Sequence, residues 1–152
     1  MTDSEKSVEA KQHPWMATQN LKECFAQLES DDESMLGNAS DALESSGPPR
    51  FEDSAFLRQQ LVSENSNRVY WSCTLLGRLA PAGFSTIDKN RIQAELGQVL
   101  NRSKLDLSAR ERAAWAIGEL GSLGKELRTT MESLIGNAPP RLKRLLESAL
   151  AT

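Results

Sequence analysis

The stretch Ala109–Gly121, with the sequence ARERAAWAIGELG, decides the fold class of this chain. Its apolar residues recur at spacings of three and four, which places them on one side of an α-helix. The residues of this stripe are Ala113, Ala116, Ile117 and Leu120. Ser108 and Glu111 precede the stripe at the spacing of a capping box, which predicts the start of the helix. Glycines from Gly121 to Gly124 predict its end.

Seven further stretches carry stripes of the same kind, and breaks rich in proline, glycine, serine or asparagine separate them. No stretch shows the sustained alternation of apolar and polar residues that is typical of a strand. The sequence therefore predicts an all-α fold of about eight helices and no sheet. The helices fall into four pairs, which we expect at residues 14–45, 52–80, 87–121 and 125–151.

Start and stop signals flank several of these helices. Asp31 or Asp32 is expected to cap the helix that ends near residue 45, because a carboxylate accepts hydrogen bonds from free backbone N–H groups. Asn65–Asn67 supplies N-cap candidates for a helix over 67–80. Pro14 suits the first turn of the first helix, and Pro81–Gly83 predicts the end of the helix before it.

Apolar positions and glycines recur at fixed offsets between the pairs. Leu57, Ile92 and Leu127 are spaced 35 residues apart, and Gly77 and Gly118 are 41 apart in similar surroundings. A glycine inside a helix costs about 1 kcal/mol relative to alanine, so two equivalent glycines predict close approach to a neighbouring helix at both places. Such recurrence is typical of stacked helix pairs.

The stretch Ala109–Gly121 resembles the second helix of a HEAT repeat, with Arg110 at the usual arginine position. It departs from that pattern at Ala109, where valine is usual, and at Arg112, which interrupts an alanine run. The match is best over 107–124 and weaker over 66–83. The resemblance implies a right-handed, solenoid-like stack of antiparallel helix pairs, an α-α superhelix, and a generic helical bundle is the alternative.

Composition and charge indicate one ordinary globular domain. The chain has 152 residues and a net charge of −3, with the negative charge concentrated in its first half. Residues 1–13 hold almost nothing that could be buried, so we expect a disordered tail before a single helical-repeat domain over 14–151. Without an apolar leader or a membrane-length apolar run, and with two cysteines expected to be reduced, a cytoplasmic protein without membrane contact is expected.

Few residues suggest chemistry. His13 is the only histidine, and Cys24 and Cys73 lie 49 residues apart, so no catalytic triad and no four-ligand zinc site is expected. The chain lacks the paired His-Glu motifs of HEAT-like iron hydroxylases and any glycine-rich phosphate loop. We therefore expect no enzyme activity, no metal and no cofactor.

Three tryptophans are the most informative aromatic residues. Trp15 is expected to cover the core near Cys24 and Phe25. Trp71 and Trp115 lie off the centres of their apolar stripes, which is compatible either with core between repeats or with an exposed surface. In the second reading they line the surface of the second helices, because tryptophan and arginine are enriched in binding hot spots. The candidate partner-binding residues are Arg68, Trp71, Arg78, Arg112, Trp115 and Glu119.

Three functions are compatible with these features. The first is a non-catalytic module that binds an unknown protein partner, since stacked helix pairs offer an extended face. The second is a nucleic-acid binder that resembles HEAT-like DNA glycosylases, with a basic face of Arg110, Arg112, Lys125, Arg128, Arg141, Lys143 and Arg144. The third is a module that resembles HEAT-like lyases or chaperones, and no motif in the sequence supports it. The acidic composition and the helix-end positions of several cations favour the first.

Overall fold

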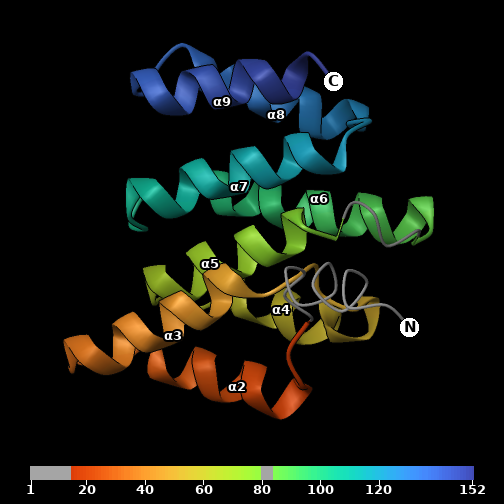
Figure 1. Cartoon of the computed structure of the whole chain (residues 1–152). Coiled ribbons are helices and arrows are strands. Elements are labelled where there is room, and N and C mark those ends of the chain that lie inside the picture. Colours follow the sequence, from red (N-terminus) through yellow and green to blue (C-terminus); the bar gives the residue numbers. More distant parts are fainter. Residues whose placement is uncertain (1–14, 80–83) are drawn as a thin grey trace, which may run out of the picture.

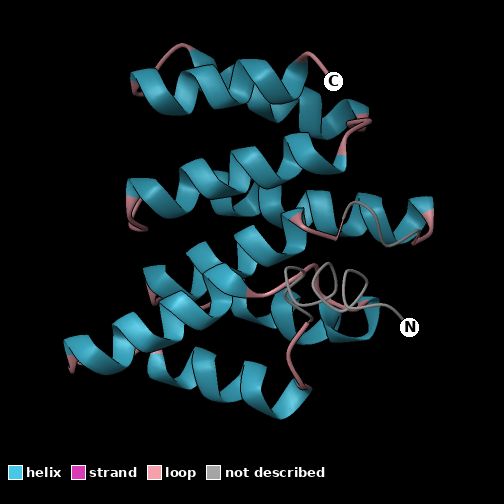
Figure 2. Ribbon diagram, viewed as in Figure 1, coloured by secondary structure: helices cyan, strands magenta, loops and turns pink. Residues whose placement is uncertain are grey.

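All regular elements in residues 15–79 and 84–152, which the computed structural model describes, are helices, and these residues contain no strand (Figure 2). The all-α prediction is confirmed for this part of the chain. The tail at 1–13, Pro14 and the predicted break Pro81–Gly83 lie outside the described residues. The elements are α2 (Thr18–Gln27), α3 (Glu33–Ser45), the 3-10 helix η1 (Phe51–Asp53), α4 (Ser54–Gln60), α5 (Ser66–Gly77), α6 (Thr86–Leu100), α7 (Leu107–Leu120), α8 (Lys125–Ile135) and α9 (Pro140–Leu150).

Neighbouring helices along the chain pack as pairs: α2 with α3, α4 with α5, α6 with α7, and α8 with α9. The last three pairs meet mainly through their second helices, because α5 packs against α7 and α7 packs against α9. The first helices α6 and α8 also touch. Figure 1 shows the pairs following one another in chain order, from α2 and α3 at one end to α8 and α9 at the other.

A single apolar core runs through all four pairs. It begins at Leu21 in α2 and reaches Ala149 in α9, and it consists mostly of leucine and alanine side chains on the predicted stripes. Phe25 of α2 meets Phe56 of α4 edge to face, with ring centroids 5.4 Å apart, which joins the first pair to the second. No helix among the described residues combines the length and apolarity needed to cross a membrane.

The N-terminal ends of the helices confirm two of the predicted caps and refute one. Asp32 accepts from the backbone N–H of Ser34 at 2.9 Å, and Asn65 accepts from that of Arg68 at 3.0 Å. The capping box at Ser108 and Glu111 is wrong. The backbone is already helical from Leu107, and the extended N-cap residue is Asp106, whose side chain makes no capping bond. Ser108 therefore lies inside the first turn, where its hydroxyl cannot act as the cap.

Other helix boundaries also differ from the sequence expectation. Among the described residues, the first helix, α2, begins at Thr18 rather than near residue 14. The first helix of the pair expected at 52–80 is split into η1 and α4 and ends at Gln60. The second helix, expected over 67–80, ends at Gly77. Boundaries of this kind depend on caps and turns, which stripes of apolar residues do not specify.

The C-terminal ends of six of the eight α-helices in the described residues share one device. The last carbonyl groups of a helix receive no hydrogen bond from the backbone of that helix. At each of these six ends, a side chain from another element donates to one such carbonyl, at 2.7–3.4 Å. The donors and acceptors are Asn67 to Leu28 after α2, Arg78 to Leu43 in α3, Arg102 to Leu61 after α4, Arg110 to Leu100 in α6, Gln93 to Gly121 after α7, and Arg128 to Leu150 in α9.

Asp53 anchors the segment that precedes α2. Its carboxylate is 3% exposed and accepts from Trp15 Nε1 at 2.6 Å and from Thr18 Oγ1 at 2.9 Å. Arg50 Nη2 lies 3.4 Å from the same carboxylate. Trp15 also packs against the core, as expected, but its hydrogen bond to η1 was not predicted. A buried carboxylate with three donors is satisfied, so this cluster fixes the chain path.

The two equivalent glycines lie where helices approach each other, which confirms that prediction. A Cβ atom placed on Gly77 of α5 would lie 2.5 Å from Trp115 Cζ3 and 3.1 Å from the Cα of Ala116, both in α7. One placed on Gly118 of α7 would lie 3.4 Å from the Cα of Ala149 in α9. The contact between α5 and α7 is therefore tighter than the contact between α7 and α9.

These distances predict opposite effects for the same substitution at the two glycines. We expect Gly77→Ala to lower the free energy of unfolding by about 1–3 kcal/mol, because the new methyl group overlaps Trp115 and presses on the α7 backbone. We expect Gly118→Ala to be neutral or to stabilise by up to about 1 kcal/mol, since the site accepts a methyl group and alanine favours the helix. Chemical denaturation measures both, and equal losses would contradict the difference in spacing.

Candidate partner-binding groove

Two adjoining hollows lie along α7 and α9, and together we call them the α7–α9 groove. One has a volume of about 200 Å³ and the other of about 220 Å³, and Trp115 and Leu145 line both. The first is also lined by Tyr70, Ser108, Glu111, Arg112 and Arg141. The second is also lined by Ala114, Gly118, Glu119, Ser148, Ala149 and Thr152.

The periodicity of the α-helix places these residues on one face of each helix. Those from α7 and those from α9 each follow spacings of three and four. Arg141 lies 4.0 Å from Glu111 near the starts of the two helices, and Ala149 lies opposite Gly118 near their ends. The helices are therefore parallel. From Ser108 to Glu119 the groove follows α7 for about 17 Å, at 1.5 Å per residue.

Arg112 is held in place by two aromatic rings. Its guanidinium carbon lies 4.9 Å from the ring centroid of Tyr70 and 4.9 Å from that of Trp115. Its Nη2 donates to the Tyr70 hydroxyl at 2.6 Å. Cation–π contacts and a hydrogen bond fix the position of the charged group, so it is already ordered before any ligand arrives.

Three of the six residues predicted to bind a partner lie together in this groove: Arg112, Trp115 and Glu119. Trp115 is partly exposed, and Glu119 is exposed. Trp71 does not join them. It is 8% exposed and belongs to the core, where its ring meets that of Tyr70 edge to face. The position off the stripe that Trp71 and Trp115 share thus leads to two different environments.

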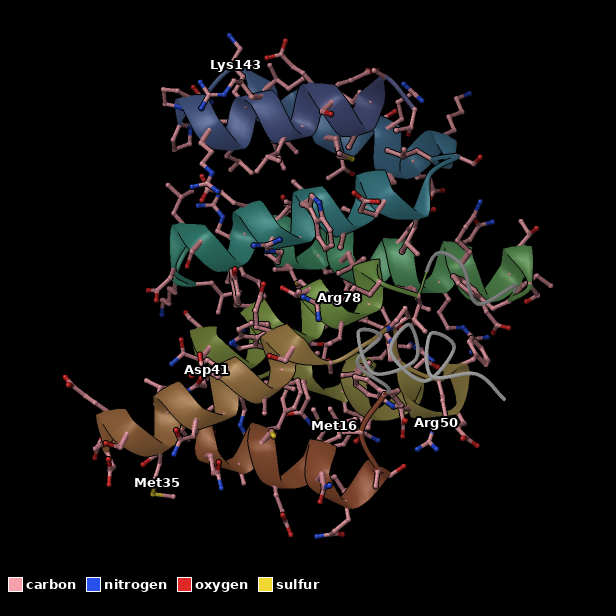
Figure 3. The ribbon with its side chains drawn as sticks, in the orientation of Figure 1. Met16, Met35, Asp41, Arg50, Arg78 and Lys143 are labelled. Atoms are coloured by element: carbon pink, nitrogen blue, oxygen red, sulfur yellow. The ribbon has the colours of Figure 1, made fainter. Side chains whose placement is uncertain are left out.

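Arg68 and Arg78 join α5 to the first helix pair instead of lining the groove. Arg78 reaches from the end of α5 towards α3, where it donates to the carbonyl of Leu43 at 3.0 Å (Figure 3). Arg68 Nη1 donates to Gln60 Oε1 at 3.1 Å, and its Nε lies 3.2 Å from a carboxylate oxygen of Glu29. Both guanidinium groups are occupied by contacts within the chain.

Tyr70 and Leu145 are among the groove residues that were not singled out in the sequence. A signal for Tyr70 was present, because the 41-residue offset that relates Gly77 to Gly118 also relates Tyr70 to Glu111. Leu145 is one of the regularly spaced apolar residues that predict the last helix, and nothing distinguishes it from the others in the sequence. It is partly exposed because α9 has no further pair packed beyond it in the described residues.

The cysteine thiols are poorly suited to nucleophilic chemistry. Cys73 is completely buried, and loss of solvation raises its pKa well above the usual range. Burial, with a smaller effect of the charge on Glu23, also raises the pKa of Cys24, which lines a hollow of about 440 Å³ between α2 and α3. Both cysteines are free. Within the described residues, no group of three or more His, Cys, Asp and Glu side chains is placed to hold a metal ion.

Comparison of the chain with protein-family models, with curated proteins and with solved structures gives no match in any of the three. The description of the groove therefore rests on its own geometry. That geometry combines a half-exposed tryptophan, an ordered arginine and a channel between two parallel helices.

The raised pKa values predict how the two thiols react with a maleimide. Because a raised pKa leaves less thiolate at a given pH, Cys24 should label at pH 8 more slowly than a thiol in an unfolded peptide, and its rate should continue to increase above pH 9. Cys73 should label only after unfolding. Mass spectrometry of the native protein and of the Cys24→Ser variant distinguishes the two sites. Fast labelling of native Cys24→Ser would contradict the burial of Cys73.

Proposed function

We propose that this chain is a non-catalytic helical-repeat protein that binds a segment of a protein partner in the α7–α9 groove. The observation that carries this proposal is the arrangement of Arg112 between Tyr70 and Trp115 at the centre of the groove. Tryptophan, tyrosine and arginine are the residue types that contribute most to binding energy at protein interfaces. A positioned guanidinium beside a partly exposed indole costs little further ordering when a ligand binds.

The proposed architecture is a right-handed, HEAT-like α-α superhelix. Its support is the packing of the last three second helices, α5 on α7 and α7 on α9, together with the glycines that allow both contacts. In such an array the second helices form a continuous face, and the groove is a part of that face.

Several contacts favour a protein partner over nucleic acid. In the predicted basic face, Arg110 and Arg128 donate to carbonyl groups at helix ends, and Arg112 donates to Tyr70. The carboxylate of Glu111 lies beside Arg141. A nucleic-acid backbone needs many free cations. This chain has a net charge of −3, and Arg110 and Arg128 of the predicted basic face are bound to helix ends, so the match is poor.

The absence of catalysis is likewise part of the proposal. Its support is that both thiols have raised pKa values and that buried Asp53 is satisfied by Trp15, Thr18 and Arg50. No cofactor is proposed. A cytoplasmic location is proposed because both cysteines are free, as is usual in a reducing compartment.

The repeat architecture predicts a gradient of local stability along the chain. In a linear array each pair is stabilised only by its neighbours, so we expect amides of α5 and α7 to exchange with solvent more slowly than those of α2 and α9 at the two ends. Native-state hydrogen exchange measures this gradient. Equal protection of all four pairs would indicate a single cooperative bundle and would oppose the superhelix.

The binding proposal predicts that blocking the groove removes specific partners. Ser148→Arg adds a long side chain to an exposed position in the second hollow, and Ser133→Arg adds the same side chain to an exposed position of α8 outside the groove. Proteins recovered with the wild type and with Ser133→Arg, but not with Ser148→Arg, would support the proposal. If quantitative mass spectrometry finds the same proteins with all three baits, the groove is not the binding site.

A further inference from the structure

Charge is distributed unevenly along the α7–α9 groove. The charged residues of the first hollow are Glu111, Arg112 and Arg141, one acid and two bases, which gives a net charge of +1. The second hollow has Glu119 as its one charged side chain, which gives −1. Between these ends, Trp115 and Leu145 provide an apolar centre. The groove is therefore positive near the starts of α7 and α9 and negative near the end of α7.

The positive end keeps donors available to a ligand. The side chain of Arg141 is 74% exposed, and its Nε lies 4.0 Å from Glu111, too far for a hydrogen bond. Glu111 is only 14% exposed, so it offers little negative surface of its own. Arg112 makes one hydrogen bond, to Tyr70, although a guanidinium has five N–H donors. A carboxylate at this end would meet two cations.

The shape of the groove fits a short helix. It runs about 17 Å between parallel helices, which is the length of about three helical turns. The described residues present no sheet edge to which a strand could be added. An amphipathic helix places apolar residues at spacings of three and four on one face, which matches a channel with an apolar centre and charged ends.

We propose, on the basis of the function proposed above, that the groove binds an amphipathic helix of the partner that lies parallel to α7 and α9. Acidic residues in its first turn meet Arg112 and Arg141, large apolar residues at its centre pack on Trp115 and Leu145, and a basic residue in its last turn meets Glu119. The same order of charges, acidic first and basic last, also stabilises a free helix through its dipole. An antiparallel helix of this kind would place its acidic residues against Glu119.

The orientation can be tested with two peptides of about 14 residues and identical composition. The forward peptide has glutamates in its first turn, leucines at spacings of three and four, and lysines in its last turn. The reversed peptide exchanges the glutamates and lysines. Fluorescence anisotropy with the full chain should show that the forward peptide binds about tenfold more tightly at low salt. Arg141→Glu should remove or invert this preference.

Matched variants separate this inference from the proposed function. Ser148→Arg should weaken both peptides, whereas Ser133→Arg should leave both unchanged. Equal affinities that are both lost in Ser148→Arg would overturn the orientation but leave the groove as a binding site. Binding unaffected by Ser148→Arg would overturn both statements. Failure of both peptides to bind, or displacement of the forward peptide by single-stranded DNA at equal concentration, would overturn the helical protein partner.

Discussion

Carbonyl groups at the C-terminal end of a helix have no partner inside that helix, and this constraint organises the whole molecule. Asn67 and Arg78 of the second pair donate to the ends of α2 and α3, and Arg102, just after α6, donates to the end of α4. The carbonyls of Leu28 and Leu61 receive a side-chain donor only when the next pair is in position, whereas that of Leu43 also accepts from the hydroxyl of Ser46. A buried carbonyl left without a donor costs about 1–3 kcal/mol, so these bonds select one register between pairs where apolar packing alone would allow several.

This constraint also explains why arginines are divided between two roles. Gln93, Arg110 and Arg128 act within pairs, where each helix caps its partner or is capped by it. The other role belongs to arginines that donate to no carbonyl group at a helix end. Arg112 faces two aromatic rings, and Arg141 projects from the first turn of α9. Lys143, two residues after Arg141, points away from α7 and lies outside the groove (Figure 3).

Much of the fold could be predicted from the sequence because apolar stripes and glycines report on local geometry. The stripe around Ile117 predicted a helix, and the equivalence of Gly77 and Gly118 predicted contacts that the structure contains. The failures have a common cause. Arg78 donates to the carbonyl of Leu43, which lies 35 residues earlier, and no sequence pattern near Arg78 predicts this hydrogen bond. The cap at Ser108 failed because the backbone had already become helical one residue before it.

The candidate site was half predictable for the same reason. Trp71 and Trp115 have similar positions relative to their stripes, and only packing between helices separates them. α5 is enclosed by its neighbours, so Trp71 is covered. Beyond α7, the wider spacing at Gly118 and Ala149 leaves a hollow beside Trp115. That spacing depends on residues of a third helix, which no local pattern in α7 encodes.

Trp115 touches Gly77 with one edge of its ring and supports Arg112 with its face. One side chain thus belongs both to the close contact between α5 and α7 and to the lining of the α7–α9 groove. A substitution at Trp115 changes how α5 and α7 fit together as well as the lining of the groove, so we expect this position to change slowly among descendants of the same ancestor. Glu119 and Ser148 are exposed and do not hold helices together, so we expect substitutions that change the groove to appear at these positions first.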